Sequence, residues 1–108
     1  MSSEIPEPTV EVTRYAVSCL PKDHPDSFHF TLRVEYRGRD RWAVTDGFAC
    51  LSTDSEWDYE PSSSNRDDNW IKTHRFDLDT ALRLAKEQAP KLTVNGLSIA
   101  DVLNRRSR

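Results

Sequence analysis

The sequence predicts an α+β domain, an antiparallel meander of three to four strands packed on one main helix, with a short C-terminal helix. Two observations support this fold class. Apolar and polar residues alternate from Phe28 to Arg37, and a period of two indicates a strand with one buried and one exposed face. Apolar residues recur at helical spacing between Asp77 and Ala89, which indicates an amphipathic helix. A sheet combined with such a helix is typical of α+β layering.

Length and composition favour a single folded unit. A chain of 108 residues can bury one hydrophobic core but not two. We expect a disordered tail over residues 1–8, one domain over residues 9–104 and a basic tail over residues 105–108. The formal net charge of −3 argues against a surface that is basic throughout, so any site for phosphate groups has to be local.

The sequence also favours a cytoplasmic protein. No stretch approaches the roughly 18 apolar residues of a membrane span. The first eight residues lack the positive and apolar regions of a signal peptide. In a reducing compartment we expect Cys19 and Cys50 to be free thiols.

The first two strands follow from β-branched residues and alternation. Residues 10–20 are rich in β-branched side chains and end before Pro21, which cannot donate a hydrogen bond to a strand ladder. Alternation places Tyr15, Val17 and Cys19 on one face. A turn follows, and the second strand then runs over residues 28–37. Its apolar face is expected to hold Phe28, Phe30, Leu32, Val34 and Tyr36.

The next strands flank the dipeptide Asp46-Gly47. Residues 42–45 and 48–51 are apolar on either side of it, and this dipeptide is preferred in type I′ hairpin turns because both central positions need a positive φ. The alternative is a bulge within one long strand. Either arrangement continues the antiparallel meander.

The two helices are predicted from the residues at their ends. Asp77 is a suitable N-cap for the main helix over residues 77–89, and Pro90 prevents its continuation. A short extended piece then closes at Asn95-Gly96. Ser98 and Asp101 have the spacing of a capping-box variant, which indicates a final short helix.

The best candidate site is the acidic loop over residues 54–69. It contains six acidic residues and one base, Arg66, so its local charge is −5. A connection this long is either functional or disordered. Aromatic residues typical of binding hot spots lie in this loop or directly after it, and the charge favours a basic partner. The candidate partner-binding residues are Glu56, Trp57, Asp58, Tyr59, Glu60 and Trp70. The competing interpretation is that Trp57 and Trp70 cover the core.

A second candidate site lies on the exposed face of the second strand. This nucleic-acid face consists of Arg33, Arg37, Arg39 and Arg41, with His29 beside them, and it could follow a phosphate backbone. Glu35 and Asp40 interrupt the stripe, and the aromatic residues of the strand are expected on the opposite, core face. The competing interpretation is an ordinary charged sheet face that discourages aggregation.

Catalytic and metal-binding patterns are weak, so we expect no enzyme, no metal and no cofactor. Cys19, His24, His29 and Cys50 are suitable zinc ligands by type, but they lack the close pairs of structural zinc sites. Two buried thiols and two surface histidines are the expected alternative. His74 could serve as a base for a cysteine, but no strained turn presents either sulfur.

The segments Trp-Ala-Val at 42–44, Glu-Trp-Asp-Tyr-Glu-Pro at 56–61 and Arg-Phe-Asp-Leu-Asp-Thr-Ala-Leu-Arg-Leu-Ala at 75–85 resemble small uncharacterised proteins of actinobacteria and their phages. The resemblance implies a bacterial or phage setting and brings no known activity. We therefore expect a non-enzymatic protein–protein interaction module, of the kind a phage uses to modulate a host protein, acting as a monomer or homodimer on a basic surface. The alternative is a weak nucleic-acid-binding protein; neither requires a membrane.

Overall fold

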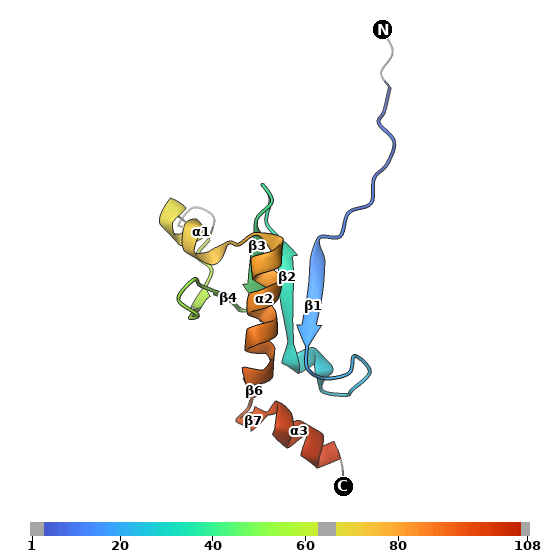
Figure 1. Cartoon of the computed structure of the whole chain (residues 1–108), viewed down its shortest axis with the longest axis vertical. Helices are drawn as coiled ribbons and strands as arrows, with labels where there is room; N and C mark the ends of the chain where they lie inside the picture. Colours follow the sequence, from blue (N-terminus) through green and yellow to red (C-terminus); the bar gives the residue numbers. More distant parts are fainter. Residues whose placement is uncertain (1–3, 63–66, 107–108) are drawn as a thin grey trace.

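The computed structural model describes residues 4–62 and 67–106, with side chains to residue 104. Within these residues an antiparallel sheet has the strand order β1-β2-β3-β4-β5 (Figure 1). Its strands are β1 (Arg14–Ser18), β2 (Thr31–Tyr36), β3 (Trp42–Thr45), β4 (Ala49–Leu51) and β5 (Trp57–Tyr59). The predicted α+β class and meander are confirmed. The predicted strand count is too low, because β5 adds a fifth strand at the edge.

Strand β2 has one dry face and one wetter face, as its alternation predicts. Leu32 and Val34 are fully buried, whereas Arg33 and Glu35 remain partly accessible. Helix α2 (Leu78–Gln88) covers the dry face and packs on β1, β2 and β3 (Figure 1). Burying an aliphatic side chain of this size stabilises the fold by about 1.5–3 kcal/mol.

Helix α2 begins and ends where the sequence predicts. The Asp77 carboxylate accepts a hydrogen bond from the Thr80 amide and caps the first turn. Ala81 and Ala85 are completely buried, and their small side chains let the helix approach the sheet closely. The 3₁₀-helix η2 (Ala89–Lys91) contains Pro90 and ends the α-helical geometry.

A second, smaller layer lies beyond one end of the sheet. Strands β6 (Thr93–Val94) and β7 (Leu97–Ser98) form a hairpin, in which Asn95 and Gly96 have φ values of 52° and 80°. Helix α3 (Ile99–Arg106) follows. Ser98 and Asp101 form the predicted capping box, with amide-to-side-chain distances of 2.9 and 3.1 Å.

This layer has its own apolar cluster, which corrects the expectation of one core. Its buried members are Leu20, Phe30 and Val102. The main cluster lies between the sheet and α2 and includes Leu32, Val34, Val44 and Leu51. The two clusters meet at Leu92, which packs against both, and the chain between η2 and α3 extends past the end of the sheet (Figure 1).

The prediction that Phe28 lies on the apolar face of a strand is wrong. Residues Ser27–Phe30 form the 3₁₀-helix η1, and the hydroxyl of Thr31, the first residue of β2, donates to the Ser27 carbonyl. A 3₁₀-helix has three residues per turn, so Phe28 and Phe30 do not share a face. Phe30 is buried, whereas Phe28 is 72% exposed.

The β3–β4 hairpin is confirmed, but its turn is not the predicted type I′. Gly47 has a φ of 103°, and no left-handed φ occurs at Asp46. The Asp46 carboxylate instead accepts hydrogen bonds from the Phe48 and Ala49 amides, each at 2.9 Å. The side chain therefore shapes this turn, and Phe48 is left outside the strand.

The segment predicted as a polar connection over residues 54–69 contains regular structure. Strand β5 pairs with β4, and helix α1 (Asp68–His74) starts at the N-cap Asp67, whose carboxylate accepts from the Trp70 amide at 2.7 Å. Residues 63–66 of the predicted loop lie outside the described residues. So do residues 1–3 and 107–108 of the predicted tails.

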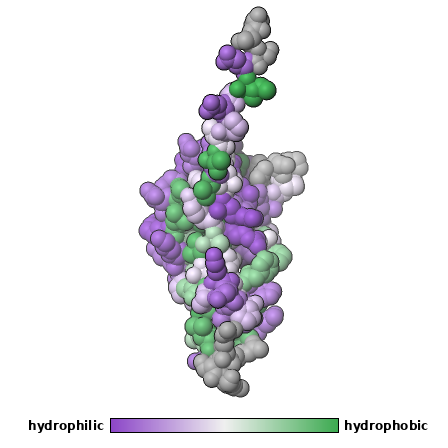
Figure 2. Space-filling model, turned by 90° about the vertical axis from the view of Figure 1, so that its right-hand side faces the viewer, coloured by the Kyte–Doolittle hydropathy of each residue, from purple (hydrophilic) through white to green (hydrophobic). Residues whose placement is uncertain are grey.

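The chain before β1 is extended and exposed from residue 4 to residue 13. Figure 2 views the molecule from the β1 side and shows this segment projecting from a largely hydrophilic surface. None of the helices in the described part of the chain is both long and apolar enough to cross a membrane.

Candidate functional site

The side of the sheet opposite α2, here called the second face, carries the polar side chains of the strands. The antiparallel register aligns Glu35 with Ala43, Thr45 with Cys50, and Cys50 with Asp58. Cross-strand partners point to the same side of a sheet, so these residues lie on the second face together. A polar cluster and two hollows occur along it.

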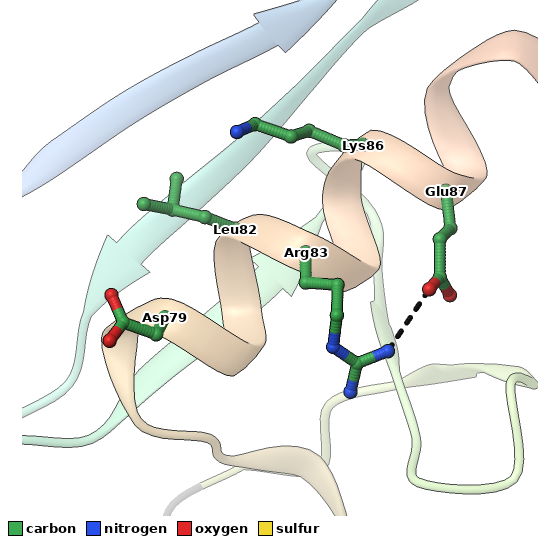
Figure 3. A pocket seen from close by; sticks show the side chains of 5 residues that line it. All are labelled: Asp79, Leu82, Arg83, Lys86 and Glu87. Carbon is green, nitrogen blue, oxygen red and sulfur yellow. Dashed lines mark hydrogen bonds and ion pairs between the residues drawn. The ribbon is translucent and has the colours of Figure 1, made fainter.

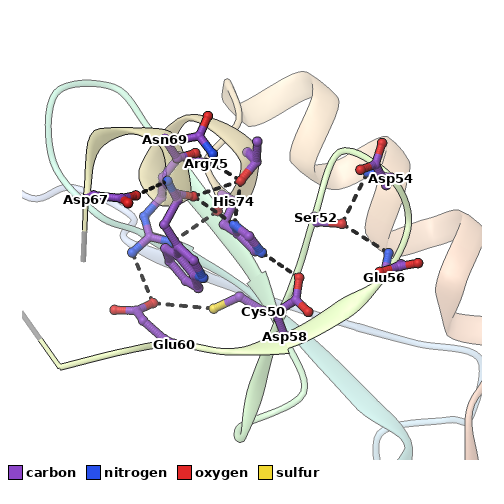
Figure 4. Close-up of polar contacts among 12 residues, drawn as sticks. Cys50, Ser52, Asp54, Glu56, Asp58, Glu60, Asp67, Asn69, His74 and Arg75 are labelled. Atoms are coloured by element: carbon purple, nitrogen blue, oxygen red, sulfur yellow. Dashed lines mark hydrogen bonds and ion pairs between the residues drawn. The ribbon is translucent and has the colours of Figure 1, made fainter. Parts of the chain in front are cut away.

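The polar cluster joins β4 and β5 to the end of α1 (Figure 4). His74 Nε2 lies 2.8 Å from Asp58 Oδ2. Arg75 Nη2 donates to Glu60 Oε1 at 3.0 Å, and the Cys50 thiol donates to the same oxygen at 3.5 Å. These contacts hold the C-terminal end of α1 on the second face.

Trp70 covers this cluster with its ring. The Trp70 and His74 rings are stacked, with centroids 3.9 Å apart and planes within 5°. The guanidinium carbon of Arg75 lies 5.4 Å from the centroid of the Trp70 ring, within the range of a cation–π contact. His74 Nδ1 also lies 2.7 Å from the Trp70 carbonyl oxygen, so both ring nitrogens face oxygen atoms.

The electrostatics of the cluster disfavour a reactive thiol. Burial raises the pKa of Cys50, and the neighbouring Glu60 carboxylate raises it further. Burial alone would raise the pKa of Glu60 as well, but the Arg75 guanidinium outweighs this effect and the net pKa is lowered. A thiol is nucleophilic as the thiolate, so this arrangement suits structural support better than covalent catalysis.

The predicted partner-binding residues do not form one exposed surface. Along β5, Trp57 and Tyr59 point to the α2 side, and Asp58 points to the second face. Trp57 is half-buried against the main core. Tyr59 is 80% exposed, and Glu56 is exposed beside the strand. The carboxylates of Asp58 and Glu60 are already bonded to His74 and Arg75.

An arginine pocket lies at the hairpin end of β2. It has a volume of about 270 Å³ and is lined by Arg37, Gly38, Arg39, Arg41, Ile71 and Arg75. Three of the four arginines predicted as a nucleic-acid face therefore come together here. Arg75 could not be predicted as a member of this pocket, because it reaches the pocket through a tertiary contact with β3.

A phenylalanine groove lies near the other end of β2. It has a volume of about 480 Å³, and its lining includes Phe28, Arg33, Phe48 and Val94. Phe28 is 72% and Phe48 81% exposed. The guanidinium carbon of Arg33 lies 5.9 Å from the centroid of the Phe28 ring. Arg33 is thus the predicted arginine that the structure separates from the other three.

The sequence could have indicated part of this groove. Phe48 follows the turn dipeptide Asp46-Gly47, and a large aromatic side chain at the tip of a hairpin has few neighbours to cover it. Phe28 gave no comparable signal, because its spacing from Phe30 and Leu32 fits a strand. Phe28 is exposed because it lies in the 3₁₀-helix η1 and not in a strand.

Of the residues considered for zinc, Cys50 is buried and His29 exposed as expected, whereas Cys19 and His24 are the reverse of the expectation. Cys19 is exposed because β1 ends at Ser18, and Cys50 is buried in the polar cluster. His24 is buried in a turn, where its Nδ1 accepts from the Asp26 amide at 3.0 Å. In the part of the chain that the structure describes, no group of three metal-ligating side chains is arranged to hold an ion.

A further pocket, of about 400 Å³, lies on the outer surface of α2 (Figure 3). All of its lining residues come from this one helix, and Arg83 donates to Glu87 at 3.0 Å across one turn. Since no second element closes the pocket, it is an ion-paired helix surface.

Comparison with known proteins adds no assignment, because no family model, curated protein or solved structure matches the chain.

Proposed function

We propose that this protein is a non-enzymatic binding protein whose second face holds single-stranded nucleic acid. The observation that carries the proposal is the phenylalanine groove, where two strongly exposed aromatic rings accompany a guanidinium. Aromatic rings that stack bases, combined with basic side chains that follow the backbone, are the usual elements of single-strand binding. Exposed apolar groups gathered at one site also indicate an interaction surface.

The spacing of the two basic hollows supports an extended ligand. Arg33 lies in β2 and Arg37 directly after it, four residues apart, which corresponds to about 13 Å along a strand. The phenylalanine groove and the arginine pocket would thus contact different parts of one chain. A single small molecule would occupy one hollow only.

The overall charge of −3 is compatible with this proposal because four arginines line hollows on one face, and the carboxylates of Glu35, Asp58 and Glu60 contact basic side chains within the chain. Arg33, Arg37, Arg39 and Arg41 provide four possible phosphate contacts. For single strands, four such contacts correspond to a slope of about −3 in log K against log salt. We therefore expect the affinity for nucleic acid to fall steeply as the salt concentration rises. The setting we propose is the cytoplasm of a bacterium, with a bacterial or phage origin for the protein.

A second candidate function is binding to a protein with a basic surface through β5, as in a phage-type modulator of a host protein. Tyr59 supports it, since it is 80% exposed on an edge strand next to the exposed Glu56. This surface has less charge to offer than the sequence predicts, because the Asp58 carboxylate contacts His74 and the Glu60 carboxylate is ion-paired with Arg75. We rank it below the second face for that reason.

Fluorescence anisotropy with a labelled single-stranded oligonucleotide of mixed sequence tests the first proposal. Replacing Phe28 and Phe48 by alanine should weaken binding at least about fivefold, since stacking contributes about 1–3 kcal/mol per base. Tyr59→Ala is the matched control, because it removes an equally exposed aromatic ring from β5. Equal losses in both variants, or no binding by the wild type at low salt, would contradict the proposal.

A further inference from the structure

The arginine pocket is assembled from two distant parts of the chain. Arg37, Arg39 and Arg41 belong to the β2–β3 hairpin, where the Arg37 amide donates to the Arg41 carbonyl at 2.8 Å. An isolated bridge then brings in Arg75. The Trp42 and Phe76 amides donate to each other's carbonyls at 2.7 and 2.9 Å. In this antiparallel pairing Arg41 lies opposite Asp77 and Arg75 opposite Ala43, so Arg41 and Arg75 are diagonal neighbours on the same side of the sheet, and both line the pocket.

The hairpin adopts a backbone that is unusual for its residues. Gly38, Arg39 and Asp40 all have a left-handed backbone, with φ values of 91°, 55° and 59°. Arginine and aspartate adopt this conformation less readily than glycine does. The tight return turns the side chains at 37, 39 and 41 toward one hollow.

Arg75 is held in place before any ligand arrives. It is 7% exposed, and it donates to Glu60 and to the His74 carbonyl, each at 3.0 Å. The Trp70 ring lies against its guanidinium. A side chain fixed in this way loses little conformational entropy when it takes a further contact.

The pocket retains positive charge after its internal ion pairs are counted. Four arginines line it, while Glu35 pairs with Arg37 at 3.2 Å and Glu60 pairs with Arg75 at 3.0 Å. The four lining arginines and the two carboxylates paired with them carry a net charge of +2. Among the described residues Arg39 and Arg41 form no ion pair, although Arg41 acts weakly on the exposed Asp77 carboxylate.

This charge distinguishes two kinds of phosphate. A phosphate inside a nucleic-acid strand is a diester with one negative charge, whereas a terminal phosphate is a monoester with about −1.5 to −2 at pH 7. Guanidinium groups bind phosphate oxygens in a bidentate manner. A pocket with a net charge of +2 and several guanidinium groups therefore matches a terminal phosphate better than an internal one.

We propose that the arginine pocket binds the terminal phosphate of a nucleic-acid strand whose bases lie over the second face. This proposal rests on the proposed function. It adds that the protein selects a phosphorylated end of the strand. Ile71 forms an apolar wall of the pocket, and the hairpin closes its other side. The strand would enter from the phenylalanine groove and end at Arg39 and Arg41.

Three labelled oligonucleotides of one sequence test this proposal, carrying a 5′-phosphate, a 3′-phosphate or hydroxyl groups at both ends. We expect one phosphorylated form to bind about tenfold tighter than the hydroxyl form, which corresponds to 1.4 kcal/mol. The Arg39→Gln/Arg41→Gln variant should lose this preference. The control Arg83→Gln/Lys86→Gln removes the same charge from the outer surface of α2 and should keep it.

The outcomes separate this inference from the proposed function. Equal binding of all three oligonucleotides overturns the terminal-phosphate site and leaves single-strand binding in place. A preference that persists in the Arg39→Gln/Arg41→Gln variant also overturns the site. Absence of binding by every oligonucleotide overturns both proposals.

Discussion

The Arg75 guanidinium lies 3.0 Å from the Glu60 carboxylate, and this ion pair joins the chain after α1 to the chain after β5. Arg75 is buried, and Glu60 is partly accessible. The pair neutralises an acidic residue that sequence reasoning assigned to a partner surface. It also positions Arg75, which is not part of the predicted nucleic-acid face, in the arginine pocket.

Removal of the Glu60 charge should destabilise the fold. Glu60→Gln eliminates a charged hydrogen bond to a buried guanidinium, and we expect the free energy of unfolding to fall by about 1.5–3 kcal/mol at pH 7. Urea denaturation followed by circular dichroism measures this change. The exposed Glu56→Gln is the control and should change the free energy by less than about 0.5 kcal/mol.

The effect of Glu60 should depend on pH in one direction. Its pKa is lowered in the folded protein from an ordinary value of 4.5, because Arg75 outweighs the effect of burial. A lowered pKa contributes stability above the unfolded pKa, and this contribution disappears as the pH falls through the folded pKa. The stability difference between wild type and Glu60→Gln should therefore shrink between pH 7 and pH 3. A difference that stays constant would show that the carboxylate charge does not matter.

The two cysteines should react at very different rates. Cys19 is exposed, whereas Cys50 is buried, and burial followed by the Glu60 charge raises the pKa of the Cys50 thiol. Since thiolates are the reactive form, a limiting amount of iodoacetamide at neutral pH should label Cys19 first. Mass spectrometry of the digested protein identifies the labelled site. Comparable labelling of both residues under native conditions would mean that the cluster around Cys50 opens readily.

The dry face of β2 should dominate stability. Leu32 is fully buried between the sheet and α2, so Leu32→Ala should lower the free energy of unfolding by about 2–5 kcal/mol. Tyr59→Ala should change it by less than about 0.5 kcal/mol, because that side chain is mostly exposed. Thermal unfolding of both variants measures the contrast. Similar losses would place the core elsewhere than between β2 and α2.

Local patterns predicted the elements that local forces determine. The alternation around Leu32 and Val34 identified the buried face of β2, and Asp77 with Pro90 bounded α2. Asn95-Gly96 turned the short hairpin because both residues accept a left-handed backbone. In each case one stretch of sequence contains all the groups that interact.

Features that depend on distant partners were not predictable in the same way. Strand β5 has only three residues and forms by pairing with β4. Three residues are too few for an alternation of apolar and polar side chains to predict a strand. Arg75 enters the arginine pocket through the bridge between Trp42 and Phe76, which joins residues far apart in the chain. Phe28 fits the alternation of β2, but the 3₁₀-helix η1 turns it outward.

Mapping of oligonucleotide contacts by NMR tests the central claim, that the second face binds single-stranded nucleic acid. Backbone amide shifts of ¹⁵N-labelled protein are followed during titration with a single-stranded oligonucleotide at low salt. We expect the largest changes at Phe28, Arg33, Phe48 and the hairpin over residues 37–41, with little change on the outer surface of α2. Changes confined to Glu56 and Tyr59, or no saturable change at all, would contradict the claim.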